Sequence, residues 1–265
     1  MYSQQKKTYF PKLKNNVDLF ILAGQSNAQG WRGNAAFYPE DKYNLDDSIG
    51  LNYTFINNTS SKGKWITMQP QEGLFPDGHF GPEVTLSRNL KKAGYNPAIF
   101  KYSLGGTSIY RDWKNPGQKG MYDGMVNALR NAIDSLVNRG FIINVRGFIW
   151  IQGESDAEND TMISAYYNNL RTMILDVRNN VVKDSSLPII LGVDEQHPWV
   201  KEHPLIVEIH KRIAKEEKYI AFTSMLGLPK ADETHLTPEG LGFHGERLFR
   251  AFIQLAEKLS LKNEK

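Results

Sequence analysis

From residue 82 onward, short apolar runs alternate with longer segments whose apolar residues recur at helical spacing. The runs predict strands at residues 97–102, 145–151, 188–193 and 219–223, and the longer segments predict helices at residues 82–93, 121–137, 163–177 and 204–217 and from residue 237. An earlier apolar run at residues 17–23 predicts a further buried strand. Because strands that alternate with helices form a parallel sheet covered on both faces, the expected fold class is α/β.

Polar motifs follow several of the predicted strands. Gly-Gln-Ser-Asn follows the first strand at residues 24–27, Gly-Gly-Thr-Ser follows the second at residues 105–108, and Gln-Gly-Glu follows the third at residues 152–154. An Asp-x-x-His pair at residues 232–235 lies in the loop after the last strand. Right-handed crossovers bring the carboxyl ends of parallel strands to one edge of the sheet, so we expect the four motifs to converge there.

Three residues in these motifs are suited to acyl transfer. Ser26 is the candidate nucleophile, and His235 is the candidate base that takes its proton. Asp232 is placed to accept the second imidazole N–H and to fix the tautomer of the ring. An oxyanion needs donors as well. The candidates are the main-chain N–H groups of Ser26 and of either Gly105 or Gly106, together with the side-chain amide of Gln152.

The ordered set of motifs resembles the four motif blocks of the SGNH hydrolase superfamily. More narrowly, it is similar to the sialate O-acetylesterase-like branch, which includes the family 6 carbohydrate esterases, and the similarity runs from about residue 17 to the last helix. The resemblance implies a flavodoxin-like three-layer α/β/α sandwich with a central parallel sheet. It also implies removal of acetyl groups from sugars through an acyl-serine, without a metal or other cofactor.

The third motif leaves one role open. Many members of the superfamily have Asn where this chain has Gln152, and the narrower branch has Gln. Some members of that branch use the Glu that corresponds to Glu154 to orient the histidine. Asp232 and Glu154 are therefore both candidates for this role. The Gly-Pro-Glu at residues 81–83 also resembles the branch, and we interpret its Glu83 as a structural brace near the serine.

The aromatic and polar residues near the motifs predict contacts with a sugar, because aromatic faces suit the apolar faces of pyranose rings. Arg32 and Arg111 are each a candidate for contact with a substrate carboxylate, such as that of sialic acid, or for a surface ion pair. The predicted substrate contacts are Gln25, Asn27, Trp31, Arg32, Thr107, Tyr110, Arg111 and Trp113.

The length of the chain suits one esterase domain. We expect this domain at residues 17–260, preceded by a polar arm at residues 1–16 and followed by a tail at residues 261–265. A long loop at residues 31–82 interrupts it, and the alternating segments 51–56 and 64–68 predict a hairpin within this loop.

The composition excludes several classes of function. With no cysteine, the chain has neither disulfides nor thiolate metal sites, and its net charge of +3 does not indicate a nucleic-acid partner. No apolar window reaches transmembrane length, and the N-terminus lacks the apolar stretch of a signal peptide. The sequence as it stands indicates a cytoplasmic protein, or a secreted one if a signal was trimmed. It leaves the oligomeric state open.

Two other functions remain to be weighed. A broader esterase or lipase-like hydrolase would need an apolar tunnel, whereas residues 31–82 are aromatic and polar. A non-catalytic sugar-binding module would have lost part of the catalytic set, and the set is complete here. The sequence therefore favours a carbohydrate O-acetylesterase acting on acetylated xylan-type polysaccharide or on sialic acid.

Overall fold

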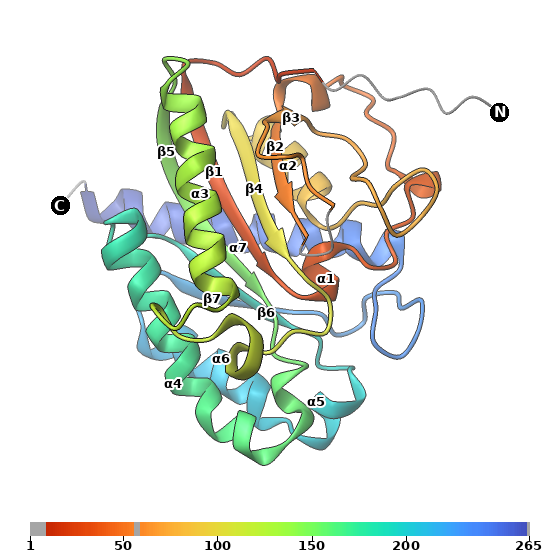
Figure 1. The fold of residues 1–265 in the computed structure, drawn as a ribbon, viewed down its shortest axis with the longest axis vertical. Helices are drawn as coiled ribbons and strands as arrows, with labels where there is room; N and C mark the ends of the chain where they lie inside the picture. The colour runs from red at the N-terminus through yellow and green to blue at the C-terminus, as the bar shows by residue number, and fades with distance from the viewer. Residues whose placement is uncertain (1–8, 56–58, 264–265) are drawn as a thin grey trace.

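A seven-stranded sheet runs through the computed structural model, which describes residues 9–55 and 59–263 (Figure 1). The strand order is β3-β2-β4-β1-β5-β6-β7, and every neighbouring pair is parallel except β2 and β3. The strands are β1 (Asn16–Gly24), β2 (Gly50–Thr54), β3 (Ile66–Thr67), β4 (Pro97–Ser103), β5 (Ile142–Ile151), β6 (Ile189–Val193) and β7 (Ile220–Ser224).

Helices cover both faces of this sheet, with α3 in front of one face and α7 behind the other (Figure 1). The helices are α1 (Ser26–Gln29), α2 (Glu83–Lys92), α3 (Met121–Val137), α4 (Asp160–Asp176), α5 (Pro198–Glu202), α6 (Leu205–Glu216) and α7 (Pro238–Asn263). Short 3-10 or π turns occur at η1 (Ala35–Phe37), η2 (Asp46–Ser48), η3 (Ile109–Trp113), η4 (Asp156–Glu158) and η5 (Val177–Val182).

The alternation of side chains along β1 divides the core in two. Leu19 and Ile21 pack in a cluster with residues of α3, α4 and α6, whereas Phe20 and Leu22 pack with residues of α2 and α7. Successive side chains of a strand point to opposite faces, so a strand with buried apolar residues on both faces needs a helical layer on each side. The predicted three-layer α/β/α sandwich is confirmed.

The order of five strands indicates which edge of the sheet is expected to hold the site. β4-β1-β5-β6-β7 is the flavodoxin-like order 2-1-3-4-5, in which the direction of winding reverses beside the first strand. Ligands of open α/β sheets bind at this switch point, outside the carboxyl ends of the strands. Here the carboxyl ends of β1 and β4 lie beside α1 (Figure 1).

The long loop contributes to the central sheet. The predicted hairpin is present, since β2 and β3 pair in antiparallel fashion, but β2 also pairs in parallel with β4. The sequence pattern predicted the hairpin but not that β2 would pair with β4, because this pairing joins residues that are distant along the chain. Residues 56–58, which belong to the predicted hairpin, lie outside the described residues.

Several boundaries differ from those expected. β1 begins at Asn16, the last residue of the predicted arm, and α7 continues to Asn263, inside the predicted tail. Helix α5 had no counterpart among the predicted elements. Residues 1–8 of the arm lie outside the described residues, so the domain boundaries otherwise stay predictions.

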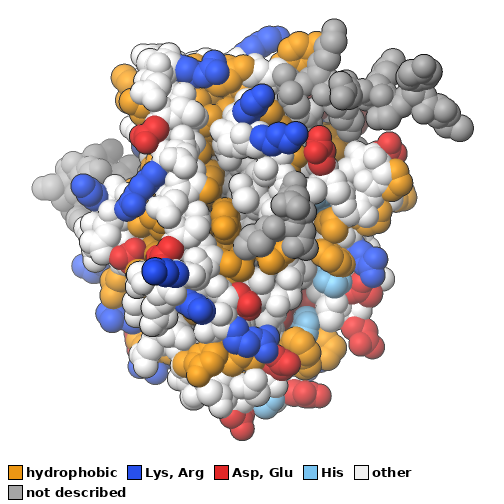
Figure 2. Space-filling view, viewed as in Figure 1, with side chains coloured by type: hydrophobic (Ala, Val, Ile, Leu, Met, Phe, Trp, Pro, Cys, Tyr) orange, Lys and Arg blue, Asp and Glu red, His pale blue; other side chains and the backbone are white. Residues whose placement is uncertain are grey.

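Charged side chains of both signs are interspersed on the face shown in Figure 2, in keeping with the small net charge of +3. Within the described ranges, no helix is both long and apolar enough to cross a membrane.

Candidate active site

The serine motif begins at a close approach between β1 and β5. Gly24 has a φ of +140°, and a Cβ on this residue would lie 2.0 Å from the carbonyl oxygen of Ile151. Only glycine fits such an approach. The chain then turns so that Ser26 becomes the first residue of α1, with 6 % of its surface exposed. The fold therefore presents Ser26 at the end of a central strand, as the sequence predicted.

Asn27 joins the serine turn to the loop that carries the histidine. Its Nδ2 donates to the carbonyl oxygen of Thr234 at 3.3 Å, and its Oδ1 accepts from the N–H of Leu236 at 3.1 Å. These two residues flank His235, so the bonds hold the histidine loop against the residue next to Ser26. The first and fourth motifs thus meet as expected. Asn27 is only 2 % exposed and its amide is bonded to the histidine loop, so its observed role is to hold that loop, and its predicted contact with substrate stays a prediction.

His235 and Asp232 form a hydrogen-bonded pair within one loop. The Nδ1 atom of His235 lies 2.9 Å from Oδ1 of Asp232 and 3.1 Å from its Oδ2. The main-chain N–H of His235 also donates to Oδ1 at 2.9 Å. This arrangement favours the proton on Nδ1 and leaves Nε2 as the basic nitrogen. Ser26 makes no hydrogen bond to His235 in the described structure, and such contacts often tighten only when substrate binds.

Arg32 completes the surroundings of Asp232. Its Nε donates to Oδ2 at 2.8 Å, so the predicted substrate contact is an ion pair with the acid that holds the histidine. Burial raises the pKa of Asp232, but hydrogen bonds from the Thr234 main chain, Arg32 and His235 outweigh burial and hold this pKa below its ordinary value. Asp232 is therefore ionised wherever His235 acts as a base.

Glu154, the rival partner of the histidine, points elsewhere. Its Oε1 accepts from the main-chain N–H of Asp194 at 2.8 Å, and its buried Oε2 has no partner among the described residues. Burial raises the pKa of Glu154 to about 7. No hydrogen bond joins it to His235 within the described structure, so the alternative left open by the sequence resolves in favour of Asp232. Glu154 lies between the ends of β5 and β6 because it follows a strand at the centre of the sheet.

The glycine motif lies against the serine. A Cβ built on Gly105 would lie 3.4 Å from the Cβ of Ser26. The N–H of Gly105 donates to Oε1 of Gln29 at 2.9 Å, which removes it as a ready oxyanion donor. In the described structure, the N–H groups of Ser26 and Gly106 have no acceptor, so these two remain the candidate donors. Sequence reasoning missed Gln29, because its role depends on the approach of two distant loops.

Gln152 has a structural role in place of the predicted oxyanion role. Its Nε2 donates to the carbonyl oxygen of Thr107 at 3.0 Å and to Oδ2 of Asp156 at 2.6 Å, which uses both hydrogens. Asp156 also accepts from the main-chain N–H groups of Ile109 and Tyr110. Burial raises the pKa of Asp156 to about 6. This buried network shapes the glycine loop, and the predicted donor role of Gln152 is corrected.

Three further predicted substrate contacts lie in the interior. Trp113 is fully buried, meets Trp150 edge to face at 4.7 Å between centroids, and donates from Nε1 to Oγ1 of Thr107 at 3.0 Å. Gln25 is buried and accepts from the N–H of Ser155 at 3.4 Å. In this structure the side chains of Trp113, Thr107 and Gln25 therefore support the loops of the site, and the predicted sugar contacts of these residues stay predictions. The sequence showed that these residues lie near a motif, but it did not show whether their side chains point toward the site or into the interior.

The remaining predicted contacts are accessible. Trp31 is 37 % exposed and stacks on the His235 ring, with centroids 6.0 Å apart and planes 27° apart. Tyr110 is 46 % exposed. Arg111 pairs with Glu158 at 2.9 Å, and both of these side chains are solvent-accessible. Trp31 and Tyr110 remain candidates for sugar contact, and Arg111 fits the surface ion pair that was its alternative.

A buried ion pair contacts the last residue of α1, the helix that begins at Ser26. Nζ of Lys101 lies 2.8 Å from Oε2 of Glu83, with both side chains fully buried, and it also donates to the carbonyl oxygen of Gln29 at 3.0 Å. The predicted role of Glu83 as a brace near the serine is consistent with these contacts. Lys101 was missed, although a lone lysine inside an apolar strand is a signal, since a buried charge needs a partner.

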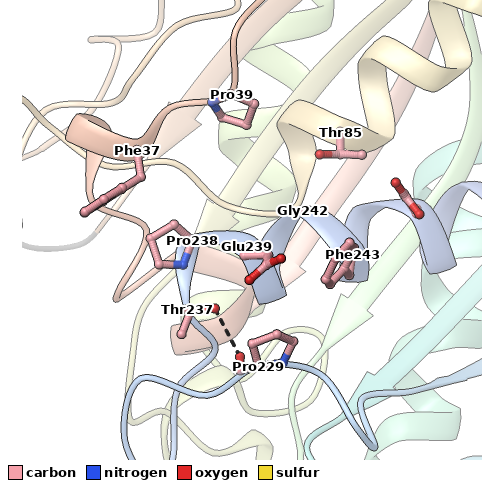
Figure 3. Close-up of a pocket in the computed structure, with 10 residues that line it drawn as sticks. Phe37, Pro39, Thr85, Pro229, Thr237, Pro238, Glu239, Gly242 and Phe243 are labelled. Carbon is pink, nitrogen blue, oxygen red and sulfur yellow. Dashed lines mark hydrogen bonds between the residues drawn. The ribbon is translucent and has the colours of Figure 1, made fainter.

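A separate pocket of about 500 Å³ lies beside the base of the histidine loop (Figure 3). The loop closes where Thr237 bonds to the carbonyl oxygen of Pro229, and Figure 3 shows both residues at the edge of the pocket, with Phe37 and Phe243. Neither Ser26 nor the Asp232–His235 pair lines this pocket, so it is distinct from the candidate active site. In the described ranges, no group of three or more His, Cys, Asp or Glu side chains is arranged to hold a metal ion.

Comparison with known families identifies one that spans almost the whole chain. The family described as carbohydrate esterase, sialic acid-specific acetylesterase, matches residues 16–254. No curated protein matches the chain. The family match confirms the resemblance inferred from the four motifs, and it covers all of the candidate catalytic residues.

Several solved structures share the fold. A protein from Arabidopsis thaliana is 22 % identical, with a TM-score of 0.66 over 91 % of this chain and 98 % of the other. NanS is 14 % identical, with a TM-score of 0.66 over 94 % of this chain and 99 % of the other. A carbohydrate acetylesterase from Xanthomonas citri is 18 % identical, with a TM-score of 0.59 over 91 % of this chain and 56 % of the other. At these identities the similarity establishes the fold.

Proposed function

Because the chain belongs to the carbohydrate esterase family of sialic acid-specific acetylesterases, we propose that it removes O-acetyl groups from a carbohydrate through an acyl-serine intermediate. Membership of this family makes the chain a carboxylic ester hydrolase. The observation that carries the mechanism is the pair of hydrogen bonds between Asn27 and the residues on either side of His235, one donated by Asn27 to Thr234 and one accepted from Leu236. These bonds hold the loop of the Asp–His pair against the residue next to Ser26, which supports the proposed acyl-serine mechanism.

In the first half of the reaction, Oγ of Ser26 attacks the acetyl carbonyl carbon while Nε2 of His235 accepts the hydroxyl proton. The carbonyl oxygen becomes an oxyanion, and the N–H groups of Ser26 and Gly106 donate to it. Asp232 stabilises the imidazolium and holds its orientation. The tetrahedral intermediate collapses as the C–O bond to the sugar breaks, and His235 gives its proton to the departing sugar oxygen.

In the second half, a water molecule replaces the sugar. His235 takes a proton from the water as the water oxygen attacks the acetyl carbon of the acyl-serine. A second oxyanion forms at the same two N–H groups, and its collapse breaks the bond between Oγ of Ser26 and the acetyl carbon. His235 returns that proton to Ser26, and the product leaves as acetic acid, which ionises to acetate and a proton in solution.

The proposed substrate is a sugar with a small acyl group. Trp31 stacks over His235, next to the position that the leaving sugar would occupy, and offers an aromatic face to a pyranose ring. The family description supports acetylated sialic acid, and acetylated xylan-type polysaccharide is the second substrate class to be tested. An acetylated carbohydrate is the proposed partner in either case.

The test compares the wild type with Ser26→Ala on p-nitrophenyl acetate, butyrate and octanoate. We expect hydrolysis of the acetate ester, with a loss of about 10⁴-fold or more in the variant, because no nucleophile replaces the hydroxyl. Ser224→Ala, which changes a serine at the end of β7, is the matched control.

Each other outcome points to a different function. Equal turnover of the octanoate ester would indicate a broader, lipase-like esterase. No turnover by the wild type of any ester or of acetylated sugars, with sugar binding retained, would contradict the proposal and indicate a non-catalytic binding module. With turnover established, acetylated xylan and O-acetylated sialic acids identify the substrate class.

A further inference from the structure

Residues 229–237 form a small hairpin with the Asp–His pair at its tip. Lys230 and Leu236 make an isolated antiparallel bridge, and the N–H of Thr237 donates to the carbonyl oxygen of Pro229 at 3.0 Å. Closer to the tip, the N–H of Ala231 donates to the carbonyl oxygen of His235 at 2.9 Å. The position of the imidazole therefore depends on how this hairpin is held against the sheet.

Lys230 connects the hairpin to the centre of the sheet. Its Nζ contacts Oδ2 of Asp194 and donates to the carbonyl oxygen of Glu233 at 2.7 Å. Asp194 directly follows β6 and is fully buried, and its N–H donates to Oε1 of Glu154 after β5. A single ammonium group thus joins the tip of the hairpin to the ends of two central strands.

We propose that Lys230 is a positioning residue that, together with Asp194, holds the hairpin so that His235 faces Ser26. The role rests on the proposed function, in which His235 takes the proton of Ser26. Asn27 holds the hairpin from the serine side, at Thr234 and Leu236, and Lys230 holds it from the sheet side, at Glu233.

The contact between Lys230 and Asp194 is strong because the Asp194 carboxylate is buried. A carboxylate with no exposed surface is costly unless a positive group is paired with it, and Lys230 of the hairpin supplies that group. The observed position of the hairpin therefore places a cation against the buried carboxylate. A displacement of about 1 Å in a catalytic group can reduce the rate about 100-fold, so the contact acts on catalysis through geometry.

The test separates positioning from charge pairing alone. Lys230→Met leaves Asp194 unpaired, and the double variant Asp194→Asn with Lys230→Met removes both charges. We expect the double variant to regain most of the melting temperature lost by the single variant, while kcat on p-nitrophenyl acetate stays about 10 to 100-fold below wild type with a smaller change in KM. Lys230→Arg keeps the cation and is expected to restore most of kcat.

Lys211→Met is the matched control, since Lys211 pairs with Glu208 on the exposed surface of α6. We expect it to leave kcat and the melting temperature unchanged. A double variant with wild-type kcat would overturn the proposal, because the charges would then serve stability alone.

Hydrogen exchange supplies a readout that does not depend on esterase activity. In the double variant, the amides of Ala231 and Leu236 are expected to exchange faster than in the wild type, because the hairpin has lost its attachment to Asp194. Unchanged exchange at these amides would also contradict the proposal. If the wild type hydrolyses no ester but exchange still increases in the variant, the proposed function fails while the attachment stands.

Discussion

The side chain of Asp232 holds both the main chain and the imidazole of the loop that carries His235. Its Oδ1 accepts from the main-chain N–H groups of Thr234 and His235, and its Oδ2 accepts from Arg32. The carboxylate therefore shapes the turn in which His235 lies and orients the imidazole at the same time. Because Asp232 and His235 are only three residues apart, one carboxylate can bond to the main chain of the turn and to the imidazole ring at its end.

Replacing Asp232 with Asn is expected to lower kcat on p-nitrophenyl acetate by about 10⁴-fold, since an amide next to Nδ1 favours the wrong tautomer. The amide oxygen can still accept from the Thr234 and His235 main chain, so the fold is expected to remain. Asp47→Asn, at an exposed carboxylate paired with Lys12, is the control. A loss smaller than tenfold in the Asp232 variant would mean that another acid supports the histidine.

Glu154 makes the stability of the protein depend on pH. Burial raises its pKa from 4.5 to about 7, so the folded state binds a proton more tightly than the unfolded state. The contribution of the Glu154 carboxyl group to the free energy of unfolding is fully present below pH 4.5. It decreases as the pH rises from 4.5 and is lost above about pH 7.

Glu154→Gln removes this dependence, because the amide stays neutral and can still accept from the N–H of Asp194. We expect the variant to gain stability relative to wild type between pH 5 and pH 8, by on the order of 3 kcal/mol. Melting temperatures of the wild type, Glu154→Gln and the nearby Glu158→Gln across this range measure the effect. A difference that does not vary with pH would show that Glu154 is ionised throughout.

At the level of elements, α1 is placed by contacts from several sides. Lys101 of β4 binds the carbonyl oxygen at the last residue of α1, and its partner Glu83 begins α2. Glu83 also accepts from Gln71 at 2.6 Å and from the N–H of Gly81 at 2.8 Å. A helix of four residues has little stability of its own, so these contacts determine where it lies.

Lys101→Met is expected to destabilise the protein by about 3–5 kcal/mol, because it leaves the Glu83 carboxylate buried without its cation. The double variant with Glu83→Gln is expected to recover much of this loss, since the amide keeps its acceptor and carries no charge. Urea unfolding of both variants and of the exposed control Lys12→Met measures the difference. Equal instability of the single and double variants would contradict the buried-charge explanation.

At the level of the whole molecule, the sheet order brings together the residues of the candidate site and its support. Ser26 follows β1, Gly106 follows β4 and Glu154 follows β5, and these three strands are neighbours although long segments separate them in sequence. The proposed reaction needs only side chains and main-chain groups from this edge. That the protein works without a metal ion stays a prediction.

Dialysis of the protein against a chelator is expected to leave its rate on p-nitrophenyl acetate unchanged, because Ser26, His235 and two N–H groups supply every proton transfer and donor in the proposed mechanism. The comparison is made with a dialysed sample that received no chelator. A loss of activity that a divalent cation restores would contradict the prediction.

The sequence by itself determined the layers of the fold and the position of each motif along the chain. Apolar periodicity is a local property, so it predicted the central strands and the larger helices. The order of the motifs identified Ser26 and His235 as candidate catalytic residues, with Asp232 and Glu154 both open as the partner of the histidine. These residues lie on turns whose local geometry their own neighbours define, as at Gly24 and within the Asp–His loop.

Only the tertiary structure decided which polar groups face the site and which are buried in its support. Gln152, Thr107 and Trp113 lie beside motif residues in sequence but point into the interior, where each has a partner from another part of the chain. The choice of Asp232 over Glu154, and the contact between Lys230 and Asp194, likewise depend on loops that meet only after folding. Hydrogen bonds between distant segments leave no periodic trace in a single sequence, because their partners are brought together by the packing of the whole sheet.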